Sequence, residues 1–473
     1  MLRRLLQSRS LTVALAAALL ALAIASLVEL RPRGVRTGHV EDLAKLSARS
    51  DLSVVFILID TLRADRLGCY GYARPTSPTL DALAATGVRF AHVTSASSWT
   101  KTSMASLWTG LHPVTHGILR YPHGLPDRAT LPAEILRDAG FRTAGLWRNG
   151  WVAPNFGFGQ GFEIYHRPLP GRGPEREARR TPSEARLPGT DEDVTRSAIE
   201  FLRGARNDRF LLYLHYMDVH QYVYDDSANF GPELSDLYDN AIRWVDRNVE
   251  ALVAAIAEQG LADRTVLVIT SDHGEGFREH GLEGHARTLY REVIDVPWIL
   301  VPPFRLDPGI VVSTPAAGVD VWPTLLDLLG QAPLPGAQGA SRAGAILAAA
   351  RAGPEPAPAA ADSGAYAELD RTWGTQGAAP DPIVAVIEGP YRWIQPLAGP
   401  AAGQLFDHRD DPREQHDVAA REPETAARLR ARVAAYSSFP PATWGAPAEV
   451  ELDQMRLEQL RALGYVVGGD DRR

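Results

Sequence analysis

The chain has 473 residues, of which 45% are hydrophobic and 22% charged, as expected of a folded globular protein with a sizeable core. Its formal net charge of -8 excludes the basic surface that nucleic-acid binding requires, so no nucleic acid is expected as a partner. The single cysteine, Cys69, excludes an internal disulfide and a zinc site built from thiolates.

The N-terminal segment is apolar. Three arginines precede an uncharged, mostly apolar run over residues 10–28. A run of roughly 18 or more residues can cross a bilayer as a helix, whereas the apolar part of a signal peptide has about 7–15. The pattern favours a membrane-anchoring helix over residues 1–30, with a cleaved signal peptide as the alternative. We therefore expect a membrane-anchored protein whose body lies outside the cytoplasm, periplasmic or extracellular, or a secreted one if the segment is removed.

After a linker over residues 31–52, apolar runs alternate with helical patterns. The run over residues 53–60 is continuous, which is typical of a parallel strand buried on both faces. Further strands are expected at residues 142–147, 210–215, 265–270 and 298–301, and helices at 79–86, 131–138, 191–203 and 233–258. This alternation predicts an α/β domain with a mainly parallel sheet, which we place at residues 53–335.

The remaining chain changes in composition. Residues 336–363 are rich in Ala, Pro and Gly and predict a flexible excursion. A smaller C-terminal α+β subdomain is expected over residues 364–473, with strands at 383–387 and 391–394 and a helix at 422–436.

Three of the expected strands end in candidate metal ligands. Asp60 ends the first, Asp218 and His220 follow a later one, and Asp272 and His273 follow the third. Ligands of open α/β sheets bind beyond the carboxyl ends of the strands, so Asp60, Asp272 and His273 can converge on one divalent cation. A single aspartate at a strand end more often forms a turn or caps a helix. Three such ends in one sheet favour a metal site.

Thr100 precedes a short helix predicted over residues 102–108 and ended by Gly110. A threonine at this point can simply cap the helix. Alternatively, the N–H groups and the positive dipole at the helix start favour an oxyanion, and a metal touching the Thr100 oxygen would make it a nucleophile. Local geometry leaves both interpretations open.

The order of these residues carries a resemblance. Asp60 is followed by Thr100, which stands before the stretch 105–110, and then by the stretch 271–275. This order resembles the sulfatase branch of the alkaline phosphatase superfamily. The similarity extends over about residues 54–466. It implies an alkaline-phosphatase/sulfatase-like sheet flanked by helices, with a smaller C-terminal subdomain. It also implies a metal-dependent enzyme acting on an anionic ester, with zinc, manganese, calcium or magnesium as its ion.

The sequence departs from the sulfatase pattern at the nucleophile. Sulfatases usually oxidise a Cys or Ser to formylglycine, and alignment on residues 109–110 puts Thr100 at that position. Thr102 and Met104 stand where the pattern has proline and arginine. Threonine would give a ketone instead of an aldehyde, so it cannot become formylglycine. The site is more similar to the threonine-using phosphoethanolamine and phosphoglycerol transferases and related phosphodiesterases, whose metal is typically zinc or manganese.

The resemblance adds further candidates. His220 matches a histidine that contacts the transferred group or protonates the leaving oxygen. His285 lies 12 residues beyond His273 (285 - 273), a spacing similar to the histidine pair of the phosphoethanolamine transferases. Asp218 either binds a second metal or orients His220. The candidate substrate-binding residues are Lys101, Arg148 and Asn149.

We therefore expect a metal-dependent hydrolase or transferase of phosphate mono- or diesters with Thr100 as its nucleophile. Arg148, Asn149 and the helix start would stabilise the transferred oxygens, and His220 or His285 would protonate the leaving group. The substrate would be an anionic ester, with a lipid- or glycan-linked ester as one form of it. A sulfatase that works without formylglycine is one alternative. An inactive binding protein on the same fold is another, disfavoured because the ligands and Thr100 are present.

Overall fold

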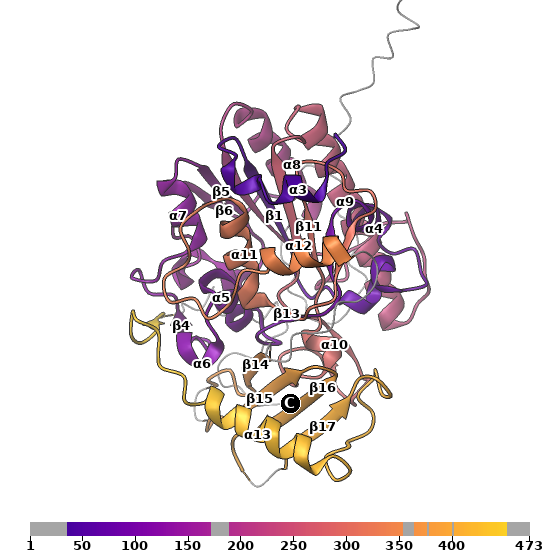
Figure 1. Ribbon diagram of the computed structural model, residues 1–473, viewed down its shortest axis with the longest axis vertical. Coiled ribbons are helices and arrows are strands. Elements are labelled where there is room, and N and C mark those ends of the chain that lie inside the picture. Colours follow the sequence, from indigo (N-terminus) through magenta and orange to yellow (C-terminus); the bar gives the residue numbers. More distant parts are fainter. Residues whose placement is uncertain (1–35, 172–188, 353–363, 376–377, 400–401, 452–473) are drawn as a thin grey trace, which may run out of the picture.

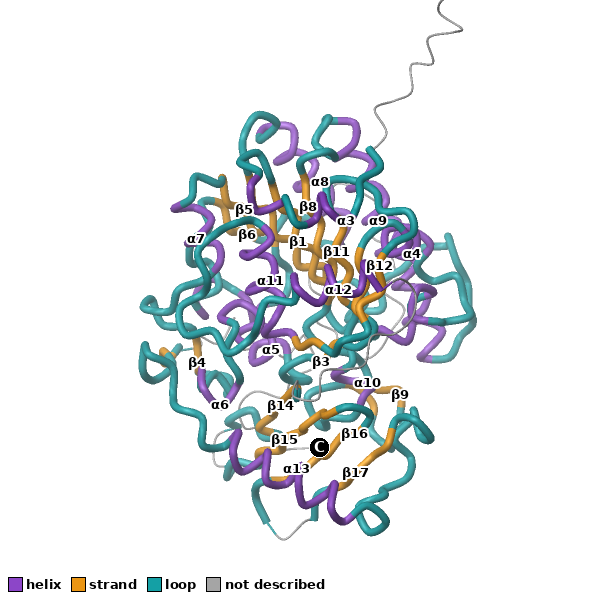
Figure 2. Tube along the Cα trace, viewed as in Figure 1, coloured by secondary structure: helices purple, strands orange, loops and turns teal. Residues whose placement is uncertain are grey.

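The computed structural model describes residues 36–171, 189–352, 364–375, 378–399 and 402–451. A large sheet surrounded by helices forms one unit, and a small sheet covered by a helix forms a second unit below it (Figure 1). Figure 2 shows short helices and loops, α6 (Pro113–His116) and α10 (Arg291–Ile294) among them, in the region where the two units meet.

The large sheet has eight strands and is mostly parallel. The central strand, β1, pairs in parallel with β7 on one side and with β8 on the other. One internal strand, β11, runs antiparallel to both of its neighbours. The spatial order is β12 (Ile310–Val312), β2 (Val88–Phe90), β11 (Trp298–Val301), β8 (Thr265–Thr270), β1 (Ser53–Ile59), β7 (Phe210–Tyr216), β5 (Arg142–Leu146) and β6 (Ile164–His166). The predicted mainly parallel α/β sheet is confirmed.

Helices cover both faces of this sheet, which explains why β1 is apolar throughout. Val54 and Phe56 belong to the core on the face covered by α5 (Thr100–Thr109), α7 (Pro132–Asp138), α11 (Val321–Leu328) and α12 (Ala343–Ala352). Val55 and Ile57 belong to the core on the opposite face, under α4 (Pro78–Ala85), α8 (Asp191–Gly204) and α9 (Leu234–Glu258). Each of these side chains contributes about 1.5–3 kcal/mol by its burial.

Short elements connect the large ones. Gly110, with φ of 68°, ends α5 in the left-handed conformation predicted for it. The remaining short strands and helices are α3 (Val40–Leu43), β3 (Val93–Thr94), β4 (His123–Gly124), β9 (Gly276–Phe277), β10 (Glu283–Gly284), β13 (Ala316–Ala317) and β18 (Ala448–Glu449), with 3-10 helices at Leu46–Ala48, Ala64–Arg66, Gly68–Tyr70, Gly150–Val152, Pro154–Phe156 and Gly318–Asp320.

The second unit is an antiparallel sheet in the order β14 (Ala365–Asp370), β15 (Pro382–Glu388), β16 (Tyr391–Pro396) and β17 (Gln404–Asp407), covered on one face by α13 (Pro423–Tyr436). Val384 and Val386 on β15 pack under α13 together with Leu429. Ile383 and Ala385 point the other way and belong to the main core. The two units therefore share one hydrophobic core.

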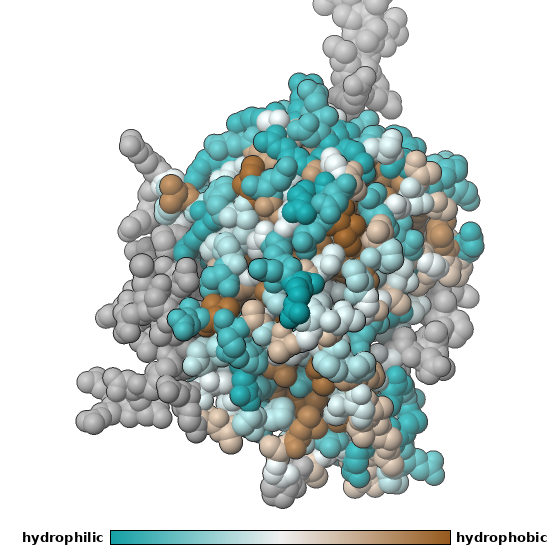
Figure 3. All heavy atoms as spheres, turned by 90° about the vertical axis from the view of Figure 1, so that its left-hand side faces the viewer, coloured by the Kyte–Doolittle hydropathy of each residue, from teal (hydrophilic) through white to brown (hydrophobic). Residues whose placement is uncertain are grey.

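The surface is mainly polar. On the face drawn in Figure 3, hydrophilic side chains predominate and hydrophobic ones lie in separate small groups. The large hydrophobic residues that are exposed in the described part of the chain stand on different elements: Leu169, Leu282, Val311 and Leu397. Apolar residues that are exposed singly are ordinary on protein surfaces and need no special explanation.

The predicted membrane anchor, residues 10–28, lies outside the described residues. Among the helices that the structure describes, none is both long enough and apolar enough to cross a bilayer. The longest of them, α9, has 25 residues, but charged side chains such as Asp246 and Arg247 interrupt it. The described helices give no support to the predicted membrane-anchored localisation, and that prediction is withdrawn together with the membrane as a partner.

Candidate active site

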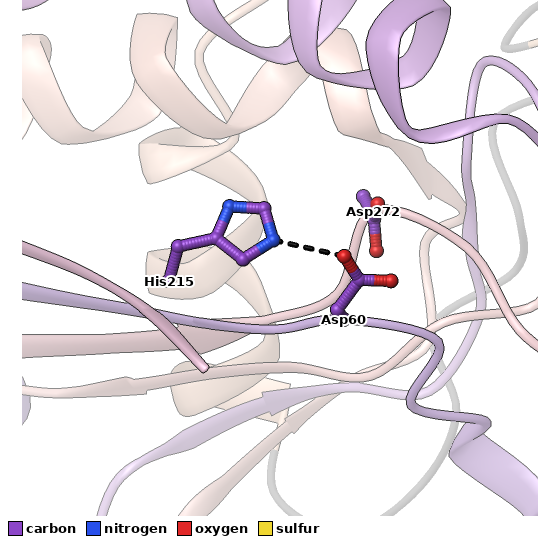
Figure 4. A group of neighbouring side chains, drawn as sticks. All are labelled: Asp60, His215 and Asp272. Atoms are coloured by element: carbon purple, nitrogen blue, oxygen red, sulfur yellow. Dashed lines mark hydrogen bonds and ion pairs between the residues drawn. The ribbon is translucent and has the colours of Figure 1, made fainter. Parts of the chain in front are cut away.

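The carboxyl ends of β1, β7 and β8 bring together three side chains that are able to bind a metal ion. Asp60 directly follows β1, and Asp272 lies two residues after β8. His215 is on β7, directly beside Leu58 of β1. Asp60, His215 and Asp272 are fully buried, and one ligand atom from each lies within 4.8 Å of the others (Figure 4). This group contains the two predicted carboxylates and one histidine that the sequence pattern did not single out.

Each of the two carboxylates has one oxygen that receives no hydrogen bond from the described residues, although His273 Nε2 lies 3.4 Å from that of Asp272. Asp60 Oδ2 accepts hydrogen bonds from Asn149 Nδ2 at 2.6 Å and His215 Nε2 at 2.9 Å, while Asp60 Oδ1 has no hydrogen-bond partner among the described residues. Asp272 Oδ1 accepts the His273 backbone N–H at 3.0 Å, and Asp272 Oδ2 is left without a hydrogen bond from this part of the chain. Buried carboxylate oxygens are costly without a partner, so this donor set fits a divalent cation.

The charges of the two aspartates act on each other. Burial raises the pKa of Asp60, but the hydrogen bond from His215 and the neighbouring histidines outweigh it, so the pKa is lower than usual. Burial and the charge of Asp60 together raise the pKa of Asp272. Two buried carboxylates this close together cannot both ionise easily, because their negative charges repel each other. A bound cation would stabilise both in the charged form.

His215 is held in one orientation. The Tyr213 hydroxyl lies 2.7 Å from His215 Nδ1, and donation from this hydroxyl leaves the proton on Nε2, which donates to Asp60. Histidines in this arrangement orient a metal-binding carboxylate. The available signal in the sequence was a polar residue inside an otherwise apolar, fully buried strand.

Thr100 is the first residue of α5, and its side chain does not cap the helix. Trp99 occupies the N-cap position, and Thr100 Oγ1 instead lies 3.0 Å from His273 Nε2 and 3.4 Å from Asn149 Nδ2. His273 Nδ1 lies 3.0 Å from the Gly274 carbonyl oxygen and donates to it, so Nε2 carries a lone pair directed at the site. The structure therefore brings Thr100, His273 and Asn149 to the carboxylates.

A second group of side chains lies beside His273. The ring centroids of His273 and His285 are 4.4 Å apart, and those of His220 and His285 are 5.0 Å apart. His285 Nδ1 lies 3.2 Å from Glu275 Oε1, and His220 Nε2 is buried without a hydrogen bond from the described residues. Burial lowers the pKa of His220 to about 4, with the charge of Asp60 only partly opposing it. Burial also acts to lower the pKa of His285, but Glu275 outweighs it and the pKa is raised.

Lys101 points away from these groups. Its Nζ donates to the Tyr121 carbonyl oxygen and is buried. Burial lowers the pKa of this amine well below its usual value. The Nζ atom lies over three aromatic rings, at 4.0 Å from the centroid of Phe156, 4.6 Å from that of Trp151 and 5.3 Å from that of Trp99.

Arg148 is bound up in a buried ion-pair network. Its Nη1 donates to Asp191 Oδ1 at 2.8 Å and also to Asp218 Oδ1, and the arginine side chain is 1% exposed. Asp218 Oδ2 accepts the Asp191 backbone N–H at 2.7 Å and Trp244 Nε1–H at 2.8 Å. The network fixes the turn that carries His220. Of the three predicted substrate-binding residues, Asn149 is the one that the structure brings to the carboxylates.

Comparison with known proteins points to one family. The sulfatase family model matches residues 53–331, more than half of the chain. The chain is 29% identical over 342 residues to arylsulfatase A of Homo sapiens, an alignment that covers 62% of this chain and 66% of that relative. It is 26% identical over 389 residues to steryl-sulfatase of Mus musculus, which covers 60% and 62%. The chain thus spans slightly less than two thirds of the length of these curated relatives.

Solved structures share the fold. A 2-O GAG sulfatase superposes with a TM-score of 0.65 at 18% identity, covering 89% of this chain and 97% of that one. The phosphonate monoester hydrolase of Agrobacterium radiobacter superposes with a TM-score of 0.63 at 19% identity, covering 82% and 95%.

The fold is that of the sulfatase-like group of ester-hydrolysing enzymes. The chain belongs to the sulfatase family. The family resemblance predicted from the order of the sequence motifs is confirmed.

Proposed function

We propose that this protein is a metal-dependent hydrolase or transferase of phosphate esters in which Thr100 is the nucleophile. The observation that carries this proposal is the contact of 3.0 Å between Thr100 Oγ1 and His273 Nε2. This contact lies beside Asp60 and Asp272, each of which has one oxygen without a hydrogen bond from the described residues. A hydroxyl that only capped α5 would bond to the backbone N–H groups of the first helical turn.

Asp60, Asp272 and His273 would hold the divalent ion, with His215 and Asn149 orienting Asp60. Two carboxylates and an imidazole suit zinc or manganese better than calcium or magnesium, which prefer sites made of oxygen alone. When bound, such an ion would lower the pKa of the Thr100 hydroxyl and neutralise charge on the transferred group.

The chain's own residues perform the transfer in two steps. Thr100 Oγ1 loses its proton to solvent and attacks phosphorus, so that a bond from Oγ1 to phosphorus forms as the bond from phosphorus to the leaving oxygen breaks. Asn149 Nδ2, 3.4 Å from Thr100 Oγ1, donates to the charge that develops there. The oxygen of water or of an acceptor alcohol then attacks phosphorus, the bond from phosphorus to Thr100 Oγ1 breaks, and the proton of the attacking group passes to Oγ1.

The leaving oxygen takes its proton from His285. The Glu275 carboxylate at 3.2 Å from His285 Nδ1 stabilises the protonated ring, as required of a general acid. His220, whose Nε2 is buried without a hydrogen bond from the described residues, contacts an oxygen of the transferred group. Arg148 has no direct part, because its guanidinium is paired with Asp191 and Asp218.

Sulfate esters are the second candidate substrate, since the named relatives are sulfatases. Threonine cannot supply the formylglycine aldehyde, so a sulfatase of this kind would also depend on the Thr100 hydroxyl. The two candidates differ in substrate and share the site.

The test compares Thr100→Val with Thr109→Val in the full-length, metal-loaded protein. Thr109 lies in the same helix, and its hydroxyl bonds within the helix to the Ala105 carbonyl oxygen at 2.6 Å. Turnover of bis(para-nitrophenyl) phosphate and para-nitrophenyl sulfate is measured for each. We expect Thr100→Val to lose at least about 100-fold in kcat on the phosphodiester, since removing a nucleophile abolishes its pathway, with Thr109→Val close to wild type. Turnover at the wild-type rate by Thr100→Val would overturn the assignment of Thr100 as the nucleophile. Faster turnover of the sulfate ester than of the phosphodiester by the wild type would favour sulfate esters as the substrate.

A further inference from the structure

The residue after His285 has an unusual backbone. Ala286 is fully buried and has a φ of 57°, in the left-handed region that residues other than glycine rarely adopt. Six non-glycine residues in the described part of the chain have such a backbone: Thr61, Tyr222, Arg278, Ala286, Trp373 and Glu414. The first two follow the site residues Asp60 and His220, and the next two belong to the segment that carries His285. The last two lie in the C-terminal unit and bond to that segment. Strained backbone of this kind persists where surrounding contacts enforce it.

Ala286 is held from two sides. Its N–H donates to the Ser98 carbonyl oxygen at 2.9 Å, two residues before Thr100. Its carbonyl oxygen accepts Trp373 Nε1–H at 2.9 Å, and Trp373 belongs to the loop that joins β14 to β15 of the C-terminal unit. The C-terminal unit thus reaches the residue next to His285.

Hydrogen bonds hold the described residues on both sides of Trp373. Asp370, the last residue of β14, accepts the Thr372 N–H and the Asp381 N–H at 3.1 Å each. The Trp373 carbonyl oxygen accepts the Tyr121 N–H at 2.8 Å. These bonds hold the indole in place to act as a donor.

The C-terminal unit holds the same segment at a second point. His280 lies at the turn of the hairpin β9–β10, between Glu275 and His285 in the sequence. Its Nδ1 lies 2.7 Å from Glu292 Oε1, and its Nε2 lies 2.9 Å from the backbone oxygen of Glu414, in the loop after β17. The His280 ring stacks on Tyr290 with centroids 3.7 Å apart.

Glu414 is fixed in turn by the groups around it. It is 1% exposed, and its carboxylate accepts His408 Nε2–H at 2.6 Å and the Arg291 backbone N–H at 2.8 Å. Arg392 Nη1 forms an ion pair with it at 3.1 Å.

We infer that the C-terminal unit positions His285, with Trp373 and Glu414 as positioning residues; the inference rests on the proposed role of His285 as general acid. The hydrogen bonds from Trp373 and to Glu414 are not needed to hold the two units together, because Ile383, Ala385 and Phe406 of the C-terminal unit already pack into the main core. The additional polar contacts converge on one segment, and that segment carries Glu275 and His285.

The test uses leaving groups that differ in their need for a proton. In the metal-loaded, full-length protein, kcat is measured with bis(para-nitrophenyl) phosphate, whose leaving group departs as an anion, and with diphenyl phosphate, whose phenolate is more basic. A misplaced general acid slows turnover of diphenyl phosphate more than turnover of the nitrophenyl ester, whereas a general loss of structure slows both alike. We expect Trp373→Phe, which keeps an aromatic ring and removes the N–H, to lose roughly 10-fold to 100-fold on diphenyl phosphate and much less on the nitrophenyl ester.

The matched control is Trp393→Phe. Trp393 lies in the same unit, and its Nε1–H donates to Gln395 Oε1 at 3.0 Å, inside the core under α13. His280→Phe, which can still stack on Tyr290, is the second variant and should reproduce the leaving-group pattern. His285→Gln is the reference for a missing acid.

The outcomes separate the two claims. If His285→Gln slows both substrates equally, the proposed role of His285 fails and the inference fails with it. If His285→Gln shows the leaving-group pattern but neither Trp373→Phe nor His280→Phe does, His285 stays the acid and the positioning inference is overturned. The pattern in both positioning variants and its absence from Trp393→Phe support the inference.

Discussion

The hydroxyl residues of α5 differ in what they bind. Thr102 Oγ1 donates to the Ile118 carbonyl oxygen at 2.8 Å, and Thr109 Oγ1 donates to that of Ala105 at 2.6 Å. Ser103 Oγ donates to the Asp272 carbonyl oxygen at 2.6 Å and so helps to hold the loop that carries this aspartate. Thr100 Oγ1 is directed at the His273 ring instead. α5 thus directs the Thr100 hydroxyl at the candidate site, while the other three hydroxyls named here donate to backbone carbonyl oxygens.

At the residue scale, His215 decides how well the ion is held. We predict that His215→Gln lowers metal affinity by about 10–100-fold, because its imidazole N–H fixes Asp60 Oδ2 at 2.9 Å. Competition with a chromogenic chelator measures the affinity. Tyr213→Phe, which removes the hydroxyl 2.7 Å from His215 Nδ1, should give a smaller loss. Unchanged affinity in His215→Gln would contradict this role.

At the element scale, Glu368 of β14 connects the small sheet to α13. Tyr436 of α13 donates its hydroxyl to Glu368 Oε2 at 2.7 Å. Burial raises the pKa of Glu368 from 4.5 to about 7, so the folded protein binds this proton more tightly than the unfolded chain. The stability that this group contributes is therefore complete below its unfolded pKa and is lost as pH rises from 4.5 to about 7.

We predict that Glu368→Gln removes this part of the pH dependence. The wild type should lose roughly 2–3 kcal/mol of unfolding free energy across that interval from this group, whereas the glutamine variant stays neutral throughout. Urea unfolding midpoints of the two proteins on either side of the interval give the comparison. Parallel pH profiles for the wild type and the variant would show that Glu368 is not the group responsible.

Long helices and strands were predictable because their hydrophobic pattern extends over enough residues to be recognised. β1 is buried at all seven positions, and α9 has 25 residues with an apolar face. β2 and β12 have three residues each and were not predicted. Their position depends on pairing with each other and on β11, which binds β2. Three residues are too few to show a period of two.

The site was predictable where the backbone alone places a residue. Asp60 and Asp272 follow adjacent strands, so the sheet brings them together whatever their side chains do. His215, inside β7, becomes a site residue through its contact with Asp60, 155 residues away in the sequence. Glu275 becomes one through its contact with His285, which the turn of the β9–β10 hairpin brings back beside it. Arg148 was assigned to substrate by residue type, but its partner Asp218 is 70 residues away in the sequence.

At the scale of the whole molecule, the buried carboxylates link metal binding to stability. Asp60 and Asp272 lie within 4.8 Å of one another, and each has a buried oxygen without a hydrogen bond from the described residues. A ligand that binds the folded state at about 100-fold above its Kd stabilises it by roughly 2.7 kcal/mol.

We predict a stabilisation of this size when zinc or manganese is added to the metal-free protein, measured as a rise in Tm. Asp272→Asn should lose the rise, because it removes one of the two carboxylates, and Asp327→Asn on α11 should keep it. An equal rise in Asp272→Asn would place the stabilising ion elsewhere.

The most direct test of the account is to find where the transferred group is held during turnover. Metal-loaded wild-type protein is mixed with excess bis(para-nitrophenyl) phosphate, quenched in acid within the first turnover and analysed by peptide mass mapping. The account predicts a phosphoryl ester on the peptide that contains Thr100, absent from Thr100→Val. Turnover without any modified peptide, or with the modification on another residue, would contradict Thr100 as the nucleophile.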